Sequence, residues 1–289
     1  MMTGKTKCYA IFGDPIEQAL SPVVHNAAYE TLGMDAGMVG CRVSTAELEA
    51  AMAGARAMHL SGLAVTMPLK AAVIPLLDGC DDMIRSLGAV NVVTCEEGRY
   101  IGYNTDGSGF LYNMKEQGVE PSGKHVLVYG AGGASRGICY ALLADGISKL
   151  TVCNGSRRRA EDMIQTLSER FSTEMEYLPL DSELIPQRCK EAQIIINTTS
   201  MGMNGSLSPH VDMIPWDELP KTTVFADIIH KPINTAFVRR AREAGFTTLT
   251  GDGMMLYQAA LAFRLLTGED APVAVMKQAI LSRLEEEHR

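Results

Sequence analysis

The chain has 289 residues, of which 46% are hydrophobic and 21% charged, and its formal net charge is −8 at pH 7. This length exceeds that of one typical domain, so we expect two domains with separate cores, and the composition excludes a disordered chain. The negative charge disfavours a nucleic-acid partner, because nucleic-acid grooves need a basic surface that displaces counterions from phosphates. We expect a small-molecule partner instead.

Strand-like runs alternate with helix-length segments from residue 8 onward, a pattern that predicts an α/β fold built from βαβ units. In the first part, strands are expected at residues 8–13, 38–43 and 62–67. A hairpin with the turn Glu96–Arg99 follows them. After the first strand, Ser21 as N-cap with Pro22 behind it predicts the start of a helix, and Gly33 predicts its end.

A longer series begins near Asp106, which we take as a domain boundary. A helix is expected from Asp106, and six strands then alternate with helices, as in a doubly wound sheet. These strands are expected at residues 125–129, 150–154, 175–178, 193–197, 223–228 and 246–249. The stretch from Met254 predicts two helices, with a break at TGEDAP, that are free to return to the first domain.

The seven cysteines are widely spaced and form no CxxC pair, which argues against a disulfide framework and a zinc site. The histidines also lack the spacing of metal ligands, so no metal is expected. The first residues, MMTGKTKCYAIFG, hold no apolar stretch like that of a signal peptide or a membrane span. We therefore expect a cytoplasmic protein without membrane contact.

A glycine-rich turn follows the first strand of the second series. The segment HVLVYGAGGASRG places Gly130, Gly132 and Gly133 between an apolar strand and a helix. Glycines let backbone N–H groups approach a pyrophosphate, and the helix N-terminus adds partial positive charge. Ser135 stands at the third glycine of the GxGxxG fingerprint, so an ordinary turn is the alternative. The position at the head of a six-strand series favours dinucleotide binding.

The end of the next strand indicates which dinucleotide binds. Enzymes that use NAD generally carry Asp or Glu there for the ribose 2′-hydroxyl, whereas NADP enzymes carry arginine for the 2′-phosphate. Here Asn154 is followed by Gly155, Ser156 and the run Arg157–Arg159. We expect NADP, with NAD as the alternative, and at least one of these arginines to be merely solvated.

Polar side chains gather at the predicted strand ends of the first part, where α/β folds build their sites. They are Ser21, Thr66, Lys70, Asn91, Asn104, Thr105 and Asp106. Lys70 stands in the first turn of a predicted helix, where a cation is unfavourable beside the positive end of the dipole. A functional lysine would explain this position, and an ordinary surface lysine is the alternative.

The combination of these segments resembles the shikimate dehydrogenase family over nearly the whole chain. The matching segments are GDPIEQALSPVVHN (13–26), VTMPLK (65–70), GAVNVV (88–93), YNTDG (103–107), GAGGASRG (130–137), INTTSMGM (196–203) and GDGMMLYQAA (251–260). The resemblance implies an α/β catalytic domain of residues 1–105 completed by 253–289, a doubly wound Rossmann NADP-binding domain of residues 106–252, and a cleft between them. It also implies NADP-linked reversible reduction of 3-dehydroshikimate to shikimate, in aromatic amino-acid (chorismate) biosynthesis.

The resemblance assigns roles residue by residue. Lys70 and Asp106 match the catalytic pair that holds the reacting hydroxyl, and a neutral lysine can take the proton of that hydroxyl as hydride leaves. The substrate contacts match Ser21, Thr66, Asn91 and Gln258, with His230 at the position of a family tyrosine. The cofactor contacts match Gly130, Ala131, Gly132, Gly133 and Ala134 at the phosphates, Asn154, Ser156, Arg157 and Arg159 at the adenosine, and Thr198, Met201, Gly251 and Met254 at the nicotinamide.

Three positions depart from the family pattern. The first serine of HSxSP is Ala19, the asparagine before VTxP is Ala64, and the tyrosine of DxxYxP is His230. Loss of one hydrogen bond to the substrate carboxylate predicts about 10- to 100-fold weaker binding. A protonated His230 would supply a charged donor in its place, and a neutral histidine at the cleft rim is the alternative.

These departures keep other functions open. One alternative is a paralogue that acts on quinate, an aminoshikimate or another hydroxylated ring acid. Another is a catalytically inactive dinucleotide-binding sensor, against which the retained Lys70 and Asp106 argue. The partner we expect is a hydroxylated ring carboxylate, bound by a monomer or a homodimer.

Overall fold

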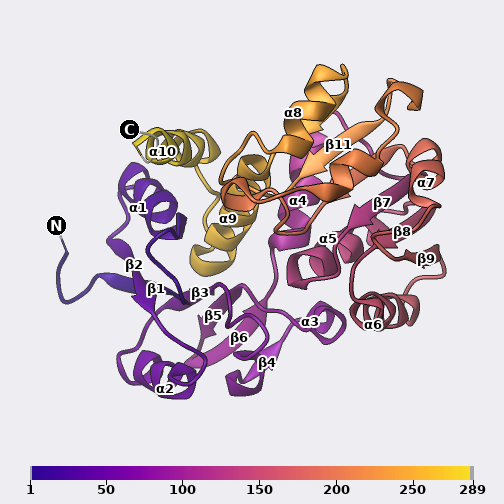
Figure 1. The fold of residues 1–289 in the computed structure, drawn as a ribbon. Helices are drawn as coiled ribbons and strands as arrows, with labels where there is room; N and C mark the ends of the chain where they lie inside the picture. The colour runs from indigo at the N-terminus through magenta and orange to yellow at the C-terminus, as the bar shows by residue number, and fades with distance from the viewer. Residues whose placement is uncertain (1, 287–289) are drawn as a thin grey trace. The chain divides into compact units, whose positions relative to one another are not determined.

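The computed structural model describes residues 2–286 (Figure 1), which form an α/β fold, as expected. The chain divides into two compact units: an N-terminal unit of Met1–Thr105 with Leu256–Arg289, and a central unit of Asp106–Met255. Within the described residues, each unit holds one six-stranded sheet. No helix in this part of the chain has both the length and the apolar character needed to cross a bilayer.

The N-terminal unit orders its strands β2-β1-β3-β5-β6-β4. The strands are β1 (Lys7–Gly13), β2 (Ala36–Arg42), β3 (Gly62–Val65), β4 (Gly79–Cys80), β5 (Val92–Glu96) and β6 (Arg99–Tyr103). Strands β1, β2 and β3 are parallel, and β5 runs antiparallel to both β3 and β6. The predicted hairpin is therefore confirmed, and Glu97 and Gly98 take the positive φ values, 52° and 80°, that its tight turn needs.

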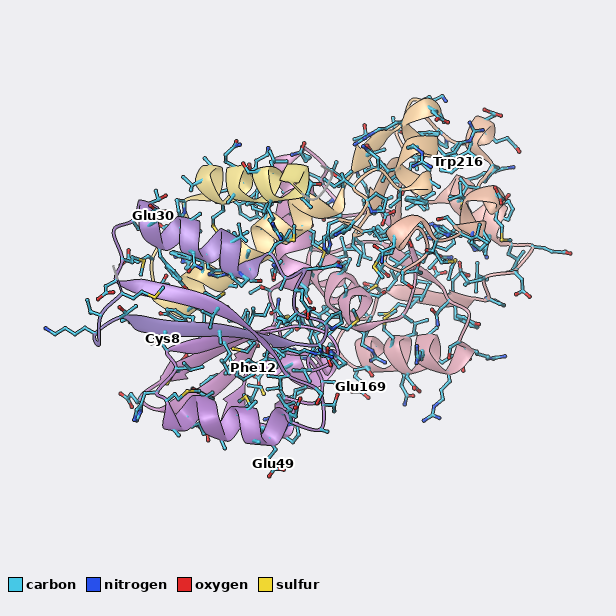
Figure 2. All side chains as sticks on the ribbon, turned by 60° about the vertical axis from the view of Figure 1, so that its left-hand side comes forward. Cys8, Phe12, Glu30, Glu49, Glu169 and Trp216 are labelled. Atoms are coloured by element: carbon cyan, nitrogen blue, oxygen red, sulfur yellow. The ribbon has the colours of Figure 1, made fainter. Side chains whose placement is uncertain are left out.

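Helices cover both faces of this sheet. They are α1 (Ser21–Thr31), α2 (Leu48–Ala57), the short η1 (Ile74–Leu76), α3 (Asp82–Leu87) and α10 (Val273–Glu286), together with the last turns of α9 (Gly251–Thr267). Figure 2 shows Glu30 of α1 and Glu49 of α2 on opposite sides of the strand that carries Phe12. Between α1 and the sheet, the Tyr29 ring stacks on Tyr9 at 5.6 Å and contacts Phe263 of α9 at 5.5 Å. The C-terminal segment thus completes the core of this unit.

One local prediction was wrong. Helix α1 begins at Ser21, and its N-cap is Leu20, not Ser21. Leu20 already has helical angles (φ −87°, ψ −14°) and is buried, so packing of its side chain fixes the entry of the chain into the helix. Gly33, with φ +63°, follows the end of the helix as predicted.

The central unit orders its strands β12-β11-β10-β7-β8-β9, all parallel. The strands are β7 (His125–Tyr129), β8 (Lys149–Cys153), β9 (Glu174–Leu178), β10 (Ile194–Asn197), β11 (Val224–Asp227) and β12 (Thr247–Leu249). Each lies within about two residues of its predicted range, as expected for short apolar runs between helices. The strand order reverses between β7 and β10, and the crevice beside such a switch point is where doubly wound sheets bind dinucleotides.

Helices flank this sheet on both sides. They are α4 (Asp106–Glu116), α5 (Gly133–Ala144), α6 (Arg157–Ser168), α7 (Ile185–Glu191), α8 (Ala236–Glu243), the first turns of α9, and the short η2 (Met203–Gly205), η3 (Pro209–Met213) and η4 (Trp216–Glu218). Side chains of α4, α5 and α6 fill one core, and those of α7, α8 and η4 fill the other. In Figure 2, Glu169 at the end of α6 and Trp216 of η4 accordingly mark opposite faces.

Candidate active site

The N-terminal unit brings several of the predicted polar residues to one edge of its sheet. Thr66 follows β3, Asn91 precedes the antiparallel β5, and Thr105 lies two residues beyond β6. The backbone joins these positions: Val65 N donates to Asn91 O at 2.9 Å, and Asn91 N donates to Tyr103 O at 3.0 Å. Because β5 is antiparallel to its neighbours, its start meets the ends of both β3 and β6.

A buried hydrogen-bond network joins Asn91, Thr105 and Gln258. Asn91 Nδ2 donates to Thr105 Oγ1 at 2.9 Å and to Gln258 Oε1 at 3.2 Å. Asn91 Oδ1 accepts from Thr105 N at 2.9 Å, and Thr105 Oγ1 donates to Gln258 O at 3.0 Å. Hydrogen bonds of Gln258 therefore link helix α9 directly to the strand ends, and Gln258 is one of the residues predicted to contact substrate.

Lys70 lies in the turn that follows Thr66. Leu69 N donates to Thr66 O at 2.9 Å, and Leu69 is fully buried, so the turn is anchored in the core. Val90 N donates to Lys70 O at 2.8 Å, which fixes the backbone of Lys70 beside that of Asn91. Lys70 itself is half-buried, so part of its side chain is shielded from solvent.

Two further predicted residues begin helices. Ser21 is the first residue of α1 and is half-buried. Asp106 is the first residue of α4, is buried, and follows Thr105 directly in the chain. The hydrogen bonds of Thr105 to Asn91 and Gln258 thus fix the backbone position from which Asp106 starts.

The glycine turn of the central unit has the features of a phosphate cradle. Helix α5 has Gly132 as its N-cap, with no side-chain capping bond. Gly132 and Gly133 are exposed, and a Cβ at either position would meet no atom within 4 Å. The first N–H groups of an α-helix have no partner within the helix, so a pyrophosphate can accept hydrogen bonds from them at this exposed turn. The flanking Ala131 and Ala134 add no bulk to this turn.

Ser135 explains how the turn tolerates the broken fingerprint. Its side chain is fully buried, and Oγ donates to Gly130 O at 2.8 Å. This hydrogen bond links Ser135 to Gly130, the first residue of the turn. The serine side chain thus satisfies the Gly130 carbonyl and does not obstruct the start of the helix. The third glycine serves close packing of helix and strand, and a small hydrogen-bonded residue can meet the same need.

The predicted adenosine residues follow β8. Asn154 Nδ2 donates to Ser156 O at 2.8 Å, and Ser156 Oγ caps α6 by accepting from Arg159 N at 3.5 Å. Arg157 pairs with Glu161 at 2.8 Å, and Arg158 lies 3.8 Å from Asp162. These two arginines thus already contact carboxylates one turn along α6. Arg159, in the first turn of the same helix, is exposed and forms no ion pair within the described residues.

The predicted nicotinamide residues lie on the other side of the switch point. Thr198 follows β10, and both its N and its Oγ1 donate to Tyr129 O, at 2.8 and 2.7 Å. A Cβ at Gly130, where φ is +111°, would collide with this threonine. Gly251 similarly lets the start of α9 approach the Ile228 backbone, and Met254 is buried behind it.

His230 and Met201 lie on segments that follow strands. His230 comes three residues after the end of β11 and is exposed, and Met201 is half-buried in the loop after β10.

Among the described residues, no group of three or more His, Cys, Asp or Glu has the arrangement of a metal site.

Sequence reasoning missed two buried residues of the central unit, Asp227 and its hydrogen-bond partner Thr235. Asp227 ends β11 and accepts hydrogen bonds from Asn197, Ile229 and Thr235. Burial raises the pKa of the Asp227 carboxyl. The signal was an aspartate that closes the apolar run VFAD, because a charged residue at the end of a buried strand needs a specific set of donors.

Comparisons with known proteins cover almost the whole chain. Three protein-family models match: the shikimate dehydrogenase substrate binding domain (residues 11–93), the shikimate / quinate 5-dehydrogenase (113–234) and the shikimate 5'-dehydrogenase C-terminal domain (251–281). The NADP(+)-dependent shikimate dehydrogenase of Desulforamulus reducens is 35% identical over 283 residues, which is 96% of each chain.

Two solved structures are also similar. Shikimate 5-dehydrogenase from Listeria monocytogenes, in complex with shikimate and NAD, is 32% identical, with a TM-score of 0.90 and coverage of 96% of this chain and 98% of that one. The 5-ketofructose reductase of a Gluconobacter strain is 31% identical, with a TM-score of 0.85 and coverage of 97% and 99%.

Proposed function

Because the chain belongs to the shikimate dehydrogenase family, an NADP-dependent oxidoreductase family that acts on a CH–OH group, we propose that Lys70 and Asp106 carry its proton chemistry. The reaction is the reversible reduction of 3-dehydroshikimate to shikimate. The observation that best supports the residue assignment is the Asn91–Thr105–Gln258 network. It fixes the substrate-facing amides and, through Thr105, the start of Asp106.

Lys70 takes the hydroxyl proton when the alcohol is oxidised and returns it when the ketone is reduced. Bound NADP supplies the hydride acceptor or donor at its nicotinamide ring. Asp106 orients the reacting hydroxyl, since its ionised carboxylate can accept a hydrogen bond from that group. The buried position of Asp106 limits competition from water for those bonds.

The remaining substrate contacts fall to four neutral side chains of the N-terminal unit. Ser21 and Thr66 donate hydroxyl hydrogen bonds to the substrate carboxylate, while Asn91 and Gln258 bind ring hydroxyls. Both amides are already oriented by the network, so little side-chain entropy is lost on binding.

The residues of the central unit fit NADP. The uncapped start of α5 and the open space at Gly132 and Gly133 suit the pyrophosphate. Arg159 is our choice for the 2′-phosphate, because Arg157 and Arg158 already contact carboxylates on α6. Exposed pairs of this kind are weak, so either arginine can still exchange its partner for the phosphate.

Alanine substitution tests the catalytic pair. Lys70→Ala and Asp106→Ala should each lower kcat by about 10²- to 10⁴-fold, the usual contribution of a positioned acid or base. Lys277→Ala, which removes an exposed lysine of α10, is the matched control and should leave kcat unchanged. Turnover by Lys70→Ala at the wild-type rate, with the fold intact by circular dichroism, would remove the lysine from the mechanism.

A different ring acid is the second candidate substrate. Ala19 and Ala64 remove polar groups that the family pattern would place at the substrate, and Ala64 is buried in β3. One structural neighbour is a 5-ketofructose reductase, so similarity at this level does not fix the substrate by itself. Absorbance of the reduced nicotinamide, followed with NADP or NAD against shikimate, quinate and aminoshikimate, ranks the candidates. No turnover with any of them would favour a dinucleotide-binding sensor.

His230 is our proposed replacement for the lost donor. A protonated imidazole would strengthen binding of an acid substrate as the pH falls. KM for the acid should therefore depend on pH between about 5.5 and 8 in the wild type and lose that dependence in His230→Tyr. Identical profiles would discard the idea.

Assembly and location complete the proposal. We infer a cytoplasmic monomer or homodimer without a nucleic-acid partner. Light scattering coupled to size exclusion measures the assembly, and cell fractionation measures the location.

A further inference from the structure

A buried polar network closes the carboxyl ends of β10 and β11. Asp227 is only 1% exposed, and its carboxylate accepts from three neutral donors. Asn197 Nδ2 and Ile229 N donate to Oδ1 at 3.1 and 3.0 Å, and Thr235 Oγ1 donates to Oδ2 at 2.7 Å. Burial of an aspartate at a strand end costs desolvation free energy, so we expect this residue to serve structure or function.

Asn197 extends this network into the following loop. Its Oδ1 accepts from Thr199 N at 3.1 Å and from Thr199 Oγ1 at 2.6 Å. Its Nδ2 donates to Met201 O at 3.3 Å as well as to Asp227, and Thr199 Oγ1 accepts from Met201 N at 3.1 Å. The loop from Thr198 to Met201 therefore takes its shape from the Asn197 amide.

Asp227 determines which way that amide points. A carboxylate can accept but not donate, so it holds the NH₂ group of Asn197 toward itself and leaves the amide oxygen for Thr199. The reversed amide would place two oxygens against each other at Asp227 and two donors against each other at Thr199. The carboxylate thus selects the amide orientation that matches the hydrogen bonds of the loop.

Thr235 holds Asp227 and also lies near Gly202, just beyond the loop. Its hydroxyl caps α8 by accepting from Val238 N at 3.2 Å while it donates to Asp227. A Cβ at Gly202, the residue that follows the loop and has φ +100°, would lie 3.4 Å from Thr235 Cβ. Thr235 is therefore linked to the loop through Asp227 and Asn197 and also lies near the residue at which the loop ends.

We propose that Asp227 and Thr235 are positioning residues that, through Asn197, set the Thr198–Met201 loop against the nicotinamide half of NADP. The proposal rests on the function proposed above. It follows the geometry of the switch point: Asn154 and Arg159 mark the adenosine half beside β8, so the other half of a dinucleotide extends to the β10 and β11 side.

Binding of two ligands separates this role from general stability. NADP contains the nicotinamide, whereas 2′,5′-ADP contains only the adenosine half and serves as the probe of that half. By calorimetry, Thr235→Val and Asp227→Asn should weaken NADP binding about 3- to 10-fold and change 2′,5′-ADP binding less than about 2-fold. Thr235→Ser keeps the hydroxyl and should bind NADP like the wild type.

The matched control is Thr223→Val. Thr223 is also buried and lies just before β11, and its hydroxyl has no hydrogen-bond partner in the described structure. This control should bind both ligands normally. Equal weakening of both ligands in Thr235→Val would indicate a merely structural role and overturn the proposal, as would unchanged binding of NADP. A wild type that binds NADP but oxidises no ring acid would instead refute the proposed function, because the binding comparison needs no turnover.

Discussion

Acidification should destabilise the central unit through His210. This imidazole is 2% exposed, and neither ring nitrogen has a hydrogen-bond partner in the described structure. It packs against the rings of Tyr129 at 4.9 Å and Phe237 at 5.4 Å. Burial lowers the pKa of His210 from 6.5 to about 4, and the nearby Asp212 offsets only part of this effect.

The direction of the effect follows from proton linkage. The unfolded chain binds a proton at this histidine near pH 6.5, whereas the folded chain does not until about pH 4. Stability is therefore fully present above pH 6.5 and falls as the pH drops from there toward 4. The value pH 5 lies about 1.5 units below the pKa of this histidine in the unfolded chain. The free energy of unfolding is therefore lower there by about 2 kcal/mol.

Urea unfolding at pH 7 and pH 5 measures this loss. His210→Leu removes the titrating group, so its loss of unfolding free energy between the two pH values should be smaller than that of the wild type by about 2 kcal/mol. His59→Asn is the control, because His59 is exposed and Asn tolerates its positive φ of 54°. An equal pH dependence in wild type and His210→Leu would refute the reasoning.

Four further substitutions test the central unit. In Gly107→Ala the new Cβ would overlap the carbonyl oxygen of Gly137 on α5, so urea unfolding should show a loss of about 3 kcal/mol. In Gly132→Ala the Cβ enters open space, so stability should change by less than about 0.5 kcal/mol, while the NADP dissociation constant rises about 10-fold because the methyl group obstructs the phosphates. Arg159→Gln should lower the NADP-over-NAD preference about 10-fold, measured as the ratio of dissociation constants, and Arg157→Gln should lower it less. A larger effect of Arg157→Gln would reverse our choice of arginine.

Four strands of the central unit (β7, β8, β10 and β11) could be predicted because each is a short, mostly apolar run that is buried along almost its whole length. Such runs carry their signal locally, and helices of regular length separate them. Strand β4 escaped prediction, since Gly79–Cys80 is too short to show any period and exists only through its pairing with β6. The start of α1 was misplaced by one residue for a related reason: tertiary burial of Leu20 outweighed the capping preference of Ser21.

From the sequence, the site could be predicted only as a group of polar residues at the ends of strands. Sequence order places Thr66, Asn91 and Thr105 after or before strands, but it does not say which of them bind one another. Asn91 and Gln258 are 167 positions apart, and only the packing of α9 beside the strand ends brings them to 3.2 Å. Thr235 was missed for the same reason, because its partner Asp227 lies eight positions away across the turn that leads into α8.

The network also limits how Asn91 can recognise a substrate. A primary amide has two donor hydrogens and two acceptor lone pairs, and at least three of these are engaged by Thr105 and Gln258. A ring hydroxyl that binds Asn91 must therefore donate to Oδ1 or displace an existing partner. The bond to Gln258 is the longest of the three at 3.2 Å, so it costs least to exchange. Under the proposed function, Gln258 released in this way is free to bind the same hydroxyl, so the two amides would bind a substrate together.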